Sequence, residues 1–367
     1  MEFDKLNNEK FIYSHSSDEL IKILYDFPGQ FKKAENIIRN IPLEFEKEYK
    51  NILILGIGNP ATTVYRLMES ISLNNIRVPI SISSSKELPT WVNSETLVIA
   101  ISHSGNTREI LNAISEVAGR GIKVYAITTG GRLKERFSNN KFVTIIEYSE
   151  KLLPRMSIGY AYVFLTDILA DAGLLSVKGF HEDKPLGNAW DDIENELLAF
   201  TKELMPEIKI NDNIAKKLAI NLYDNIPVIY GCNKITTVIS YRFKIEICAT
   251  SKMFAHFNRI PEINHDEIEG WEMDQEFRRK FIILFIKDNN TSNAMLKRIE
   301  ILKGIFLEKD IKYEEVKITG ENELVTAFKG LFLAIWTSLY LAVLYDANPV
   351  SIDLVDSIKN VLVRNNF

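Results

Sequence analysis

Leu97–Leu111 reads LVIAISHSGNTREIL, which joins an apolar run, a hydroxyl-rich turn and the start of an amphipathic segment. The apolar residues Thr96–Ile101 have the length and composition of a buried strand. The residues Arg108–Arg120 carry apolar side chains at helical spacing. A strand that passes through a short turn into a helix is the repeating unit of a parallel α/β sheet.

The same pattern recurs on both sides of this stretch. An apolar strand at Asn51–Leu55 ends at Gly56, and the second half of the chain opens in the same way with a strand at Ile226–Gly231. Further strands are expected at Arg77–Ile82, Ile122–Thr128, Phe142–Glu147, Phe281–Ile286 and Tyr313–Ile318, and helices at Thr62–Leu73, Ala161–Ala172 and Ser292–Phe306. The repetition predicts two duplicated parallel sheets.

These patterns predict an α/β protein with two domains, each a parallel sheet flanked by helices, and with extra helices at both ends. A chain of 367 residues also exceeds the size at which a single core usually stops growing. The predicted organisation is an N-terminal helical segment (1–48), a first domain (49–176), a connector with helices (177–221), a second domain (222–348) and a C-terminal helix (349–367).

Composition narrows the class of protein. A net charge of −5 argues against a nucleic-acid-binding surface, which needs an excess of Lys and Arg on one face. The longest apolar stretch, Gly330–Tyr345, is shorter than a membrane span requires and is interpreted as a buried core helix. With only Cys232 and Cys248, the chain suggests no disulfide framework, and we expect a cytoplasmic protein with no membrane partner.

The hydroxyl-rich turn Ser102–Thr107 has the composition of a phosphate site. Amide groups at a helix N-terminus favour an anion, and closely spaced Ser and Thr hydroxyls can each donate a hydrogen bond to a phosphoryl oxygen. Gly105 would allow the backbone to approach the ligand closely. The alternative is that these residues only cap the following helix, which would need a single hydroxyl.

The turn after the first strand, Gly56–Ala61, formally fits the dinucleotide-binding fingerprint. A nicotinamide site would also need an acidic residue at the end of the second strand, where Ser83, Ser84 and Ser85 stand instead. A dinucleotide cofactor is therefore disfavoured. Gly58 and Asn59 form either a tight turn or a direct contact to the ligand.

A third candidate is His265, which lies among five carboxylates in the segment Pro261–Glu272. Neighbouring acids can raise the pKa of a histidine and orient its ring for proton transfer. The alternative is an acidic helix start in which His265 serves as a cap. A metal site is disfavoured because no second histidine stands at ligand spacing in this segment.

Taken together, these residues resemble the bifunctional phosphoglucose/phosphomannose isomerases of the sugar isomerase (SIS) domain superfamily. The resemblance covers nearly the whole chain. It rests on Asp26–Gln30, Ser102–Thr107, Gly130–Leu133, Pro154-Arg155, Asn264–Ile268 and Lys359, which follow in the same order and at similar spacing.

The resemblance implies a dimer of subunits with two SIS domains each, acting on a small phosphosugar without a metal or organic cofactor. Such enzymes convert fructose 6-phosphate to glucose 6-phosphate or mannose 6-phosphate. It implies that Ser102, Ser104 and Thr107 hold the phosphate and that Arg155 stabilises an enediolate. It also implies that His265, supplied across the dimer interface, opens the sugar ring together with Lys359.

Two positions depart from the family pattern. The family reads Gly-Gly-Ser where this chain has Gly58, Asn59 and Pro60, so one backbone amide and one hydroxyl are lost. The family's proton-abstracting glutamate is replaced by Ala249.

A displaced base, Glu246 or Glu262, is one solution to the missing glutamate, although Glu246 also suits an ion pair with Arg242 one helical turn earlier. The alternative function is a sugar-phosphate-binding protein with weak or no isomerase activity.

Overall fold

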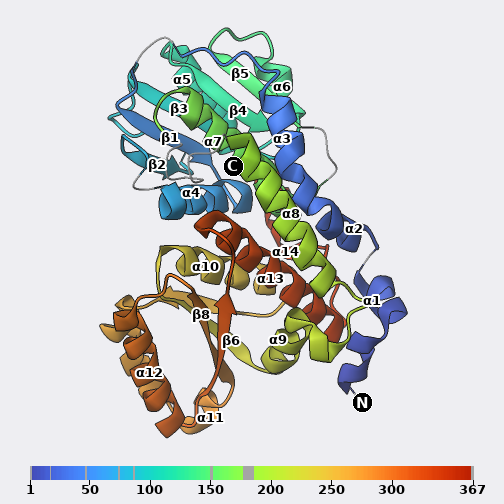
Figure 1. Cartoon of the computed structure of the whole chain (residues 1–367). Coiled ribbons are helices and arrows are strands. Elements are labelled where there is room, and N and C mark those ends of the chain that lie inside the picture. The colour runs from blue at the N-terminus through green and yellow to red at the C-terminus, as the bar shows by residue number, and fades with distance from the viewer. Residues whose placement is uncertain are drawn as a thin grey trace. The chain divides into compact units, whose positions relative to one another are not determined.

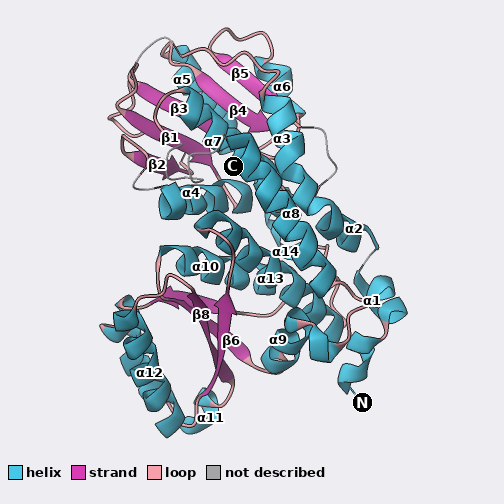
Figure 2. Ribbon diagram, in the orientation of Figure 1, coloured by secondary structure: helices cyan, strands magenta, loops and turns pink. Residues whose placement is uncertain are grey.

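The computed structural model describes residues 2–16, 18–45, 48–72, 75–85, 87–148, 152–176 and 186–364. The chain forms two compact units, which we call the first unit (Ile23–Leu198) and the second unit (Met1–Lys22 with Ala199–Phe367). Each unit contains a parallel sheet with helices packed against it, as the sequence predicts (Figures 1 and 2).

The sheet of the first unit has the strand order β2-β1-β3-β4-β5, and all its pairings are parallel. The predicted strand Thr96–Ile101 is confirmed as β3 with the same bounds. The other strands are β1 (Asn51–Gly56), β2 (Ile80–Ser83), β4 (Val124–Thr128) and β5 (Val143–Glu147). The helices are η2 (Phe27–Gly29), α3 (Gln30–Ile38), α4 (Asn59–Ser72), α5 (Arg108–Gly119), α6 (Gly131–Phe137), η3 (Pro154–Met156) and α7 (Ile158–Asp171).

Helices cover both faces of this sheet. The chain steps from β1 to β2 in one direction and from β3 to β4 in the other, so right-handed crossovers place α4 and α5 on opposite faces. On the α5 face, Ile110, Ile114 and Val117 are fully or almost fully buried against the strands. The helical spacing of these three apolar residues explains why α5 forms and which face it buries.

The sheet of the second unit has the order β7-β6-β8-β9, which repeats the order of the first four strands of the first unit. Its strands are β6 (Ile226–Gly231), β7 (His256–Arg259), β8 (Phe281–Asp288) and β9 (Lys312–Ile318). Its helices are η1 (Glu2–Asn7), α1 (Glu9–Ser16), η4 (Ile210–Asp212), α9 (Ile214–Leu222), α10 (Lys234–Ala249), η5 (Glu262–Asn264), η6 (Glu267–Glu272), α11 (Gln275–Arg278), α12 (Asn293–Glu308), α13 (Glu323–Leu344) and α14 (Asp353–Arg364). The helices α2 (Asp18–Asp26) and α8 (Leu186–Leu204) contain residues of both units.

The predicted buried helix is confirmed as α13, which packs against α9 and α10. Among the described residues, it is the one helix long and apolar enough to cross a membrane, but 94% of its most apolar window is buried inside the protein. Apolar residues on every side of a helix are what a central core position requires. We therefore interpret α13 as the core helix of the second unit.

The residues of the predicted N-terminal segment 1–48 are divided between the two units after Lys22. The Nζ atom of Lys5 donates a hydrogen bond of 2.5 Å to the carbonyl of Leu344, at the end of α13. Several short elements, among them α6, α11 and β7, have no counterpart in the sequence prediction. The first part of the predicted connector with helices (177–221), residues 177–185, lies outside the described residues.

Candidate functional site

The candidate site lies where the strand order of the first unit reverses. In a sheet of this order, ligands bind outside the carboxyl ends of the strands at the switch point, which here lies between β1 and β3. Gly56 at the end of β1 lies opposite Ile101 at the end of β3, so the turns that follow both strands are neighbours. The fold therefore brings together Gly58, Asn59 and the phosphate loop, by which we mean Ser102–Thr107.

The phosphate loop presents two hydroxyls that the protein itself does not use. Ser102 is 5% exposed, and its Oγ atom has no hydrogen-bond partner among the described residues. Thr107 is the N-cap residue of α5, but its side chain makes no capping hydrogen bond. Helix capping therefore does not account for these hydroxyls. The Ser104 hydroxyl accepts a hydrogen bond of 3.3 Å from the Asn106 amide.

A neighbouring turn fixes the shape of the phosphate loop. The Leu133 amide donates to the Gly105 carbonyl at 2.9 Å, and the Arg132 amide donates to the Asn106 side chain at 3.1 Å. Gly105 has a φ of +61°, and an added Cβ atom would lie 1.9 Å from the carbonyl oxygen of Gly130. Only glycine fits this close approach, so the turn 130–133 acts as a support for the loop.

The turn after β1 differs from the phosphate loop. Gly58 has a φ of +81°, and α4 begins at Asn59 with Pro60 in its first turn, where a missing N–H is tolerated. One turn later, the Thr63 hydroxyl is fully buried without a hydrogen-bond partner among the described residues. Thr63 therefore offers an unused hydroxyl near the position where the family's serine is lost.

Arg155 lies in the same unit, on the short helix η3 that follows β5. Its side chain is buried, with 5% exposure, and η3 packs against α4. The Gln30 side chain donates a hydrogen bond of 2.7 Å to the Met156 carbonyl, which ties α3 to the turn that carries Arg155. This contact gives a structural role to the segment Asp26–Gln30, to which the sequence alone assigned none.

His265, Glu246 and Lys359 belong to the second unit. His265 ends the 3-10 helix η5 and is exposed, and its ring makes no hydrogen bond to any described residue. In this arrangement no neighbouring acid among the described residues holds the His265 ring by a hydrogen bond. Glu267 instead accepts hydrogen bonds from Tyr230 at 2.5 Å, from Asn258 at 2.6 Å, and lies 3.1 Å from His256.

Glu246 is fully buried in α10 and pairs with Arg242 at 2.7 Å, the ion pair that the sequence suggests. Its other carboxylate oxygen accepts a hydrogen bond of 2.9 Å from Thr250. Both oxygens are therefore engaged inside the second unit. This arrangement favours the structural interpretation of Glu246, as an ion-pair partner of Arg242, over a role as a base.

Lys359 lies on α14, where its Nζ atom is 3.3 Å from Asp356. Both side chains are more than half exposed, and such a surface pair stabilises a protein by about 1 kcal/mol at most. Lys359 is therefore free to leave Asp356 for another anion.

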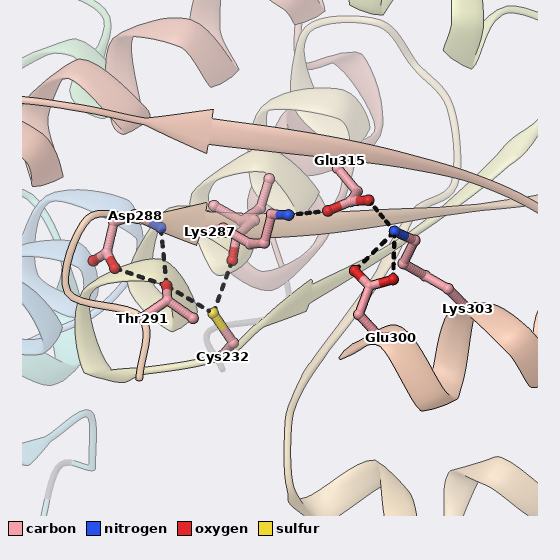
Figure 3. Close-up of polar contacts among 8 residues, drawn as sticks. Cys232, Lys287, Asp288, Thr291, Glu300, Lys303 and Glu315 are labelled. Atoms are coloured by element: carbon pink, nitrogen blue, oxygen red, sulfur yellow. Dashed lines mark hydrogen bonds and ion pairs between the residues drawn. The ribbon is translucent and has the colours of Figure 1, made fainter. Parts of the chain in front are cut away.

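The second unit has a switch point of its own, between β6 and β8, where polar side chains of the unit bond to one another (Figure 3). Asp288 accepts hydrogen bonds from Asn233 at 2.8 Å and from the Thr291 hydroxyl at 2.9 Å. The thiol of Cys232, whose pKa is raised by burial, donates to the Ile286 carbonyl at 3.2 Å. A buried carboxylate in this place opposes the binding of a phosphate.

The described residues contain no group of three or more His, Cys, Asp or Glu that could hold a metal ion.

Comparison with known proteins shows which protein family this chain belongs to. The SIS domain model matches residues 48–172, and the model of the bacterial phospho-glucose isomerase C-terminal SIS domain matches residues 211–362. A bifunctional phosphoglucose/phosphomannose isomerase from Caldicellulosiruptor bescii is 31% identical over 346 residues, covering 94% of this chain and 99% of the relative. The chain belongs to this isomerase family.

A second relative supports the family, and a solved structure supports the fold. A bifunctional phosphoglucose/phosphomannose isomerase from Aquifex aeolicus is 28% identical over 95% of this chain and 99% of its own length. The structure of a glucose-6-phosphate isomerase like protein from Thermus thermophilus has a TM-score of 0.58 at 16% identity, covering 97% of this chain and 99% of that one. The predicted architecture of two SIS domains is thereby confirmed.

Proposed function

We propose that this family member is an aldose-ketose isomerase that interconverts fructose 6-phosphate with glucose 6-phosphate, mannose 6-phosphate or both. Family membership supports the class of reaction, because the relatives matched over nearly their whole length are phosphoglucose/phosphomannose isomerases. The observation that carries the proposal for the site is the buried, unpartnered hydroxyl of Ser102 at the switch point of the first unit.

The phosphate is bound by Ser102, Ser104 and Thr107 at the N-terminus of α5. A buried hydroxyl without a partner is costly, and a phosphoryl oxygen would supply its missing acceptor. The partial positive charge at the start of a helix adds to the attraction. Gly58 and Asn59 contact the ligand from the turn after β1, with Thr63 as a further hydroxyl on the same helix.

Arg155 stabilises the enediolate that forms when a proton moves between C1 and C2. A guanidinium that is always charged and already buried needs little reorganisation when negative charge develops nearby. His265 and Lys359 open the sugar ring by moving protons at the ring and hydroxyl oxygens.

The active assembly is a homodimer in which His265 reaches the partner's site. Support comes from the exposure of the His265 ring and from α14, the helix that carries Lys359. Leu354 and Ile358 lie one turn apart on α14 with 83% and 62% exposure. Neighbouring apolar side chains that are this exposed suit a surface that packs against another subunit.

The base that moves the proton is Glu262 rather than Glu246. Glu246 is held by Arg242 and Thr250, whereas Glu262 begins the 3-10 helix whose C-cap residue is His265. Side chains three residues apart in such a helix point the same way, so Glu262 accompanies His265 to the substrate. The partner of Glu262, Arg259, is an exposed side chain at 2.7 Å that can yield to the ligand.

A second candidate function is a sugar-phosphate-binding protein without turnover. The loss of the family's base at Ala249, together with the burial of Glu246, favours it. Both candidate functions use the same phosphate loop and differ only in whether a carboxylate reaches the C1–C2 edge.

NMR of the protein with fructose 6-phosphate in heavy water distinguishes the two. The isomerase produces glucose 6-phosphate or mannose 6-phosphate with deuterium at C2, because the abstracted proton exchanges with solvent. Glu262→Gln should lower the rate about 100-fold or more, and Glu269→Gln, an exposed carboxylate in the same segment, serves as the matched control. Fructose 6-phosphate that binds but stays unchanged would support the binding protein instead.

A further inference from the structure

His103 lies inside the phosphate loop and connects it to the turn that carries Arg155. We propose that His103 is a positioning residue that sets the spacing between the phosphate loop and Arg155. This inference rests on the proposed function, because it concerns how two parts of the proposed site are held together.

Both ring nitrogens of His103 contact the segment between β5 and η3. The Nδ1 atom lies 2.8 Å from the Tyr148 hydroxyl, and the Nε2 atom lies 3.0 Å from the carbonyl oxygen of Leu152. Leu152 precedes the η3 helix Pro154–Met156 by two residues. One imidazole ring therefore bridges the loop and the start of the Arg155 turn.

The two contacts fix the protonation of the ring. A carbonyl oxygen can only accept a hydrogen bond, so Nε2 carries the proton and Nδ1 accepts from the Tyr148 hydroxyl. Burial lowers the pKa of His103, which favours the neutral ring. Burial also raises the pKa of Tyr148 to about 12, so its hydroxyl keeps the proton that it donates.

The bridge is rigid at both ends. The His103 carbonyl accepts hydrogen bonds from the amide and the hydroxyl of Thr129, at 2.9 and 2.7 Å. The Tyr148 ring stacks on Tyr160 of α7, with 4.8 Å between ring centroids. The phosphate loop and the Arg155 turn therefore cannot move apart without breaking this packing.

The rigid connection between the phosphate loop and Arg155 should matter more for the rate of the reaction than for substrate affinity. The phosphate loop holds one end of the sugar phosphate, and Arg155 must reach the charge that develops near the other end. A displacement of about 1 Å between such groups can cost about 100-fold in rate. The hydroxyls of Ser102, Ser104 and Thr107 do not depend on the His103 ring, so substrate affinity should change little.

The test compares His103→Ala, Tyr148→Phe, the double variant and His103→Gln with the wild-type protein in the fructose 6-phosphate assay. We expect His103→Ala to lower kcat by about 10- to 100-fold with KM changed less than about threefold. The double variant should be no slower than His103→Ala, because both changes break one bridge. His103→Gln should recover part of the rate, since its amide can donate to Leu152.

His256→Ala, which removes a half-exposed histidine of the second unit, is the matched control and should leave the bridge intact. An unchanged kcat in His103→Ala, or a rise in KM alone, would overturn the inference. A wild-type protein without turnover would instead contradict the proposed isomerase.

A second measurement does not depend on activity or on a variant that folds. The ¹⁵N NMR shifts of the wild-type His103 ring should report a neutral ring protonated at Nε2. A ring protonated at Nδ1, or one that titrates as freely as an exposed histidine, would show that the bridge is absent.

Discussion

The two switch points share one topology and differ in chemistry. Ile101 lies opposite Gly56 in the first unit, and Ile286 lies opposite Gly231 in the second, so His103 and Asp288 occupy equivalent places two residues further on. Likewise, Thr107 and Ser292 are the N-cap residues of equivalent helices, α5 and α12.

The two switch points differ in whether their Ser and Thr hydroxyls already have hydrogen-bond partners in the protein. Ser292 caps its helix by accepting a hydrogen bond from the Met295 amide, and the Thr291 hydroxyl donates to Asp288. By contrast, the Ser102 hydroxyl has no hydrogen-bond partner among the described residues, and the Thr107 side chain makes no capping hydrogen bond. The strand order thus gives each unit a place where a ligand could bind, and under the proposed function the unpartnered hydroxyls select the switch point of the first unit.

The largest expected effect comes from giving the first switch point the charge of the second. Thr107→Asp keeps a preferred N-cap residue, so α5 should remain stable. A carboxylate about 4 Å from the phosphate costs several kcal/mol, and we expect the affinity for fructose 6-phosphate to fall about 1000-fold by calorimetric titration.

The matched control is Ser292→Asp at the N-cap of α12, which should leave that affinity unchanged. Equal losses in both variants would mean that the comparison of the two switch points is wrong.

The two units should also respond differently to pH. Burial, with help from Asp171 and Glu35, raises the pKa of Asp167 in the first unit to about 7. The folded state then holds a proton that the unfolded chain releases near pH 4, so stability falls by about 2–4 kcal/mol as the pH rises from 4 to 7. Urea unfolding followed by Trp190 fluorescence should show this slope, and Asp167→Asn should remove most of it.

Ser102→Ala and Thr291→Ala should have opposite effects on binding and stability. Ser102→Ala removes a hydroxyl that has no protein partner, so we expect affinity to fall about 10- to 100-fold with little change in the melting temperature. Thr291→Ala breaks hydrogen bonds to Asp288 and should cost about 1–2 kcal/mol of stability without changing affinity. Scanning calorimetry with and without fructose 6-phosphate measures the stability and the ligand affinity of each variant. A loss of affinity in Thr291→Ala and a loss of stability in Ser102→Ala would mean that the second switch point, and not the first, binds the ligand.

The smallest effect is expected for Lys216 in the second unit. Its buried Nζ atom donates to the carbonyls of Pro206 and Ile208, and burial lowers its pKa to about 8. The unfolded chain binds the proton more tightly, so stability should rise by about 1–2 kcal/mol between pH 8 and 10.5. Lys216→Met should flatten that rise in urea titrations, and a stability that falls over this range would contradict the assigned shift.

Much of the fold could be predicted because its strands are continuous apolar runs that end in glycine or hydroxyl residues. The strands β3 and β6 match their predicted bounds. The edge strand β7 was missed because His256–Arg259 is short, mostly polar and only partly buried, and it is recognised only by its pairing with β6.

The part of the candidate site that lies in one continuous stretch of sequence was also predictable. The residues of the phosphate loop are contiguous, so their sequence shows their proximity. The contacts of Glu267 with Tyr230 and His256 join residues that are well separated in the sequence. Sequence spacing alone does not show that Glu267 contacts His256 and not His265. The same holds for the bridge from His103 to Tyr148 and Leu152.

A crystal structure of the protein with fructose 6-phosphate tests the central claim most directly. We predict the phosphate within hydrogen-bond distance of the hydroxyls of Ser102, Ser104 and Thr107, with the sugar directed toward Arg155. A phosphate bound instead beside Asp288 and Thr291, or away from both switch points, would contradict the account.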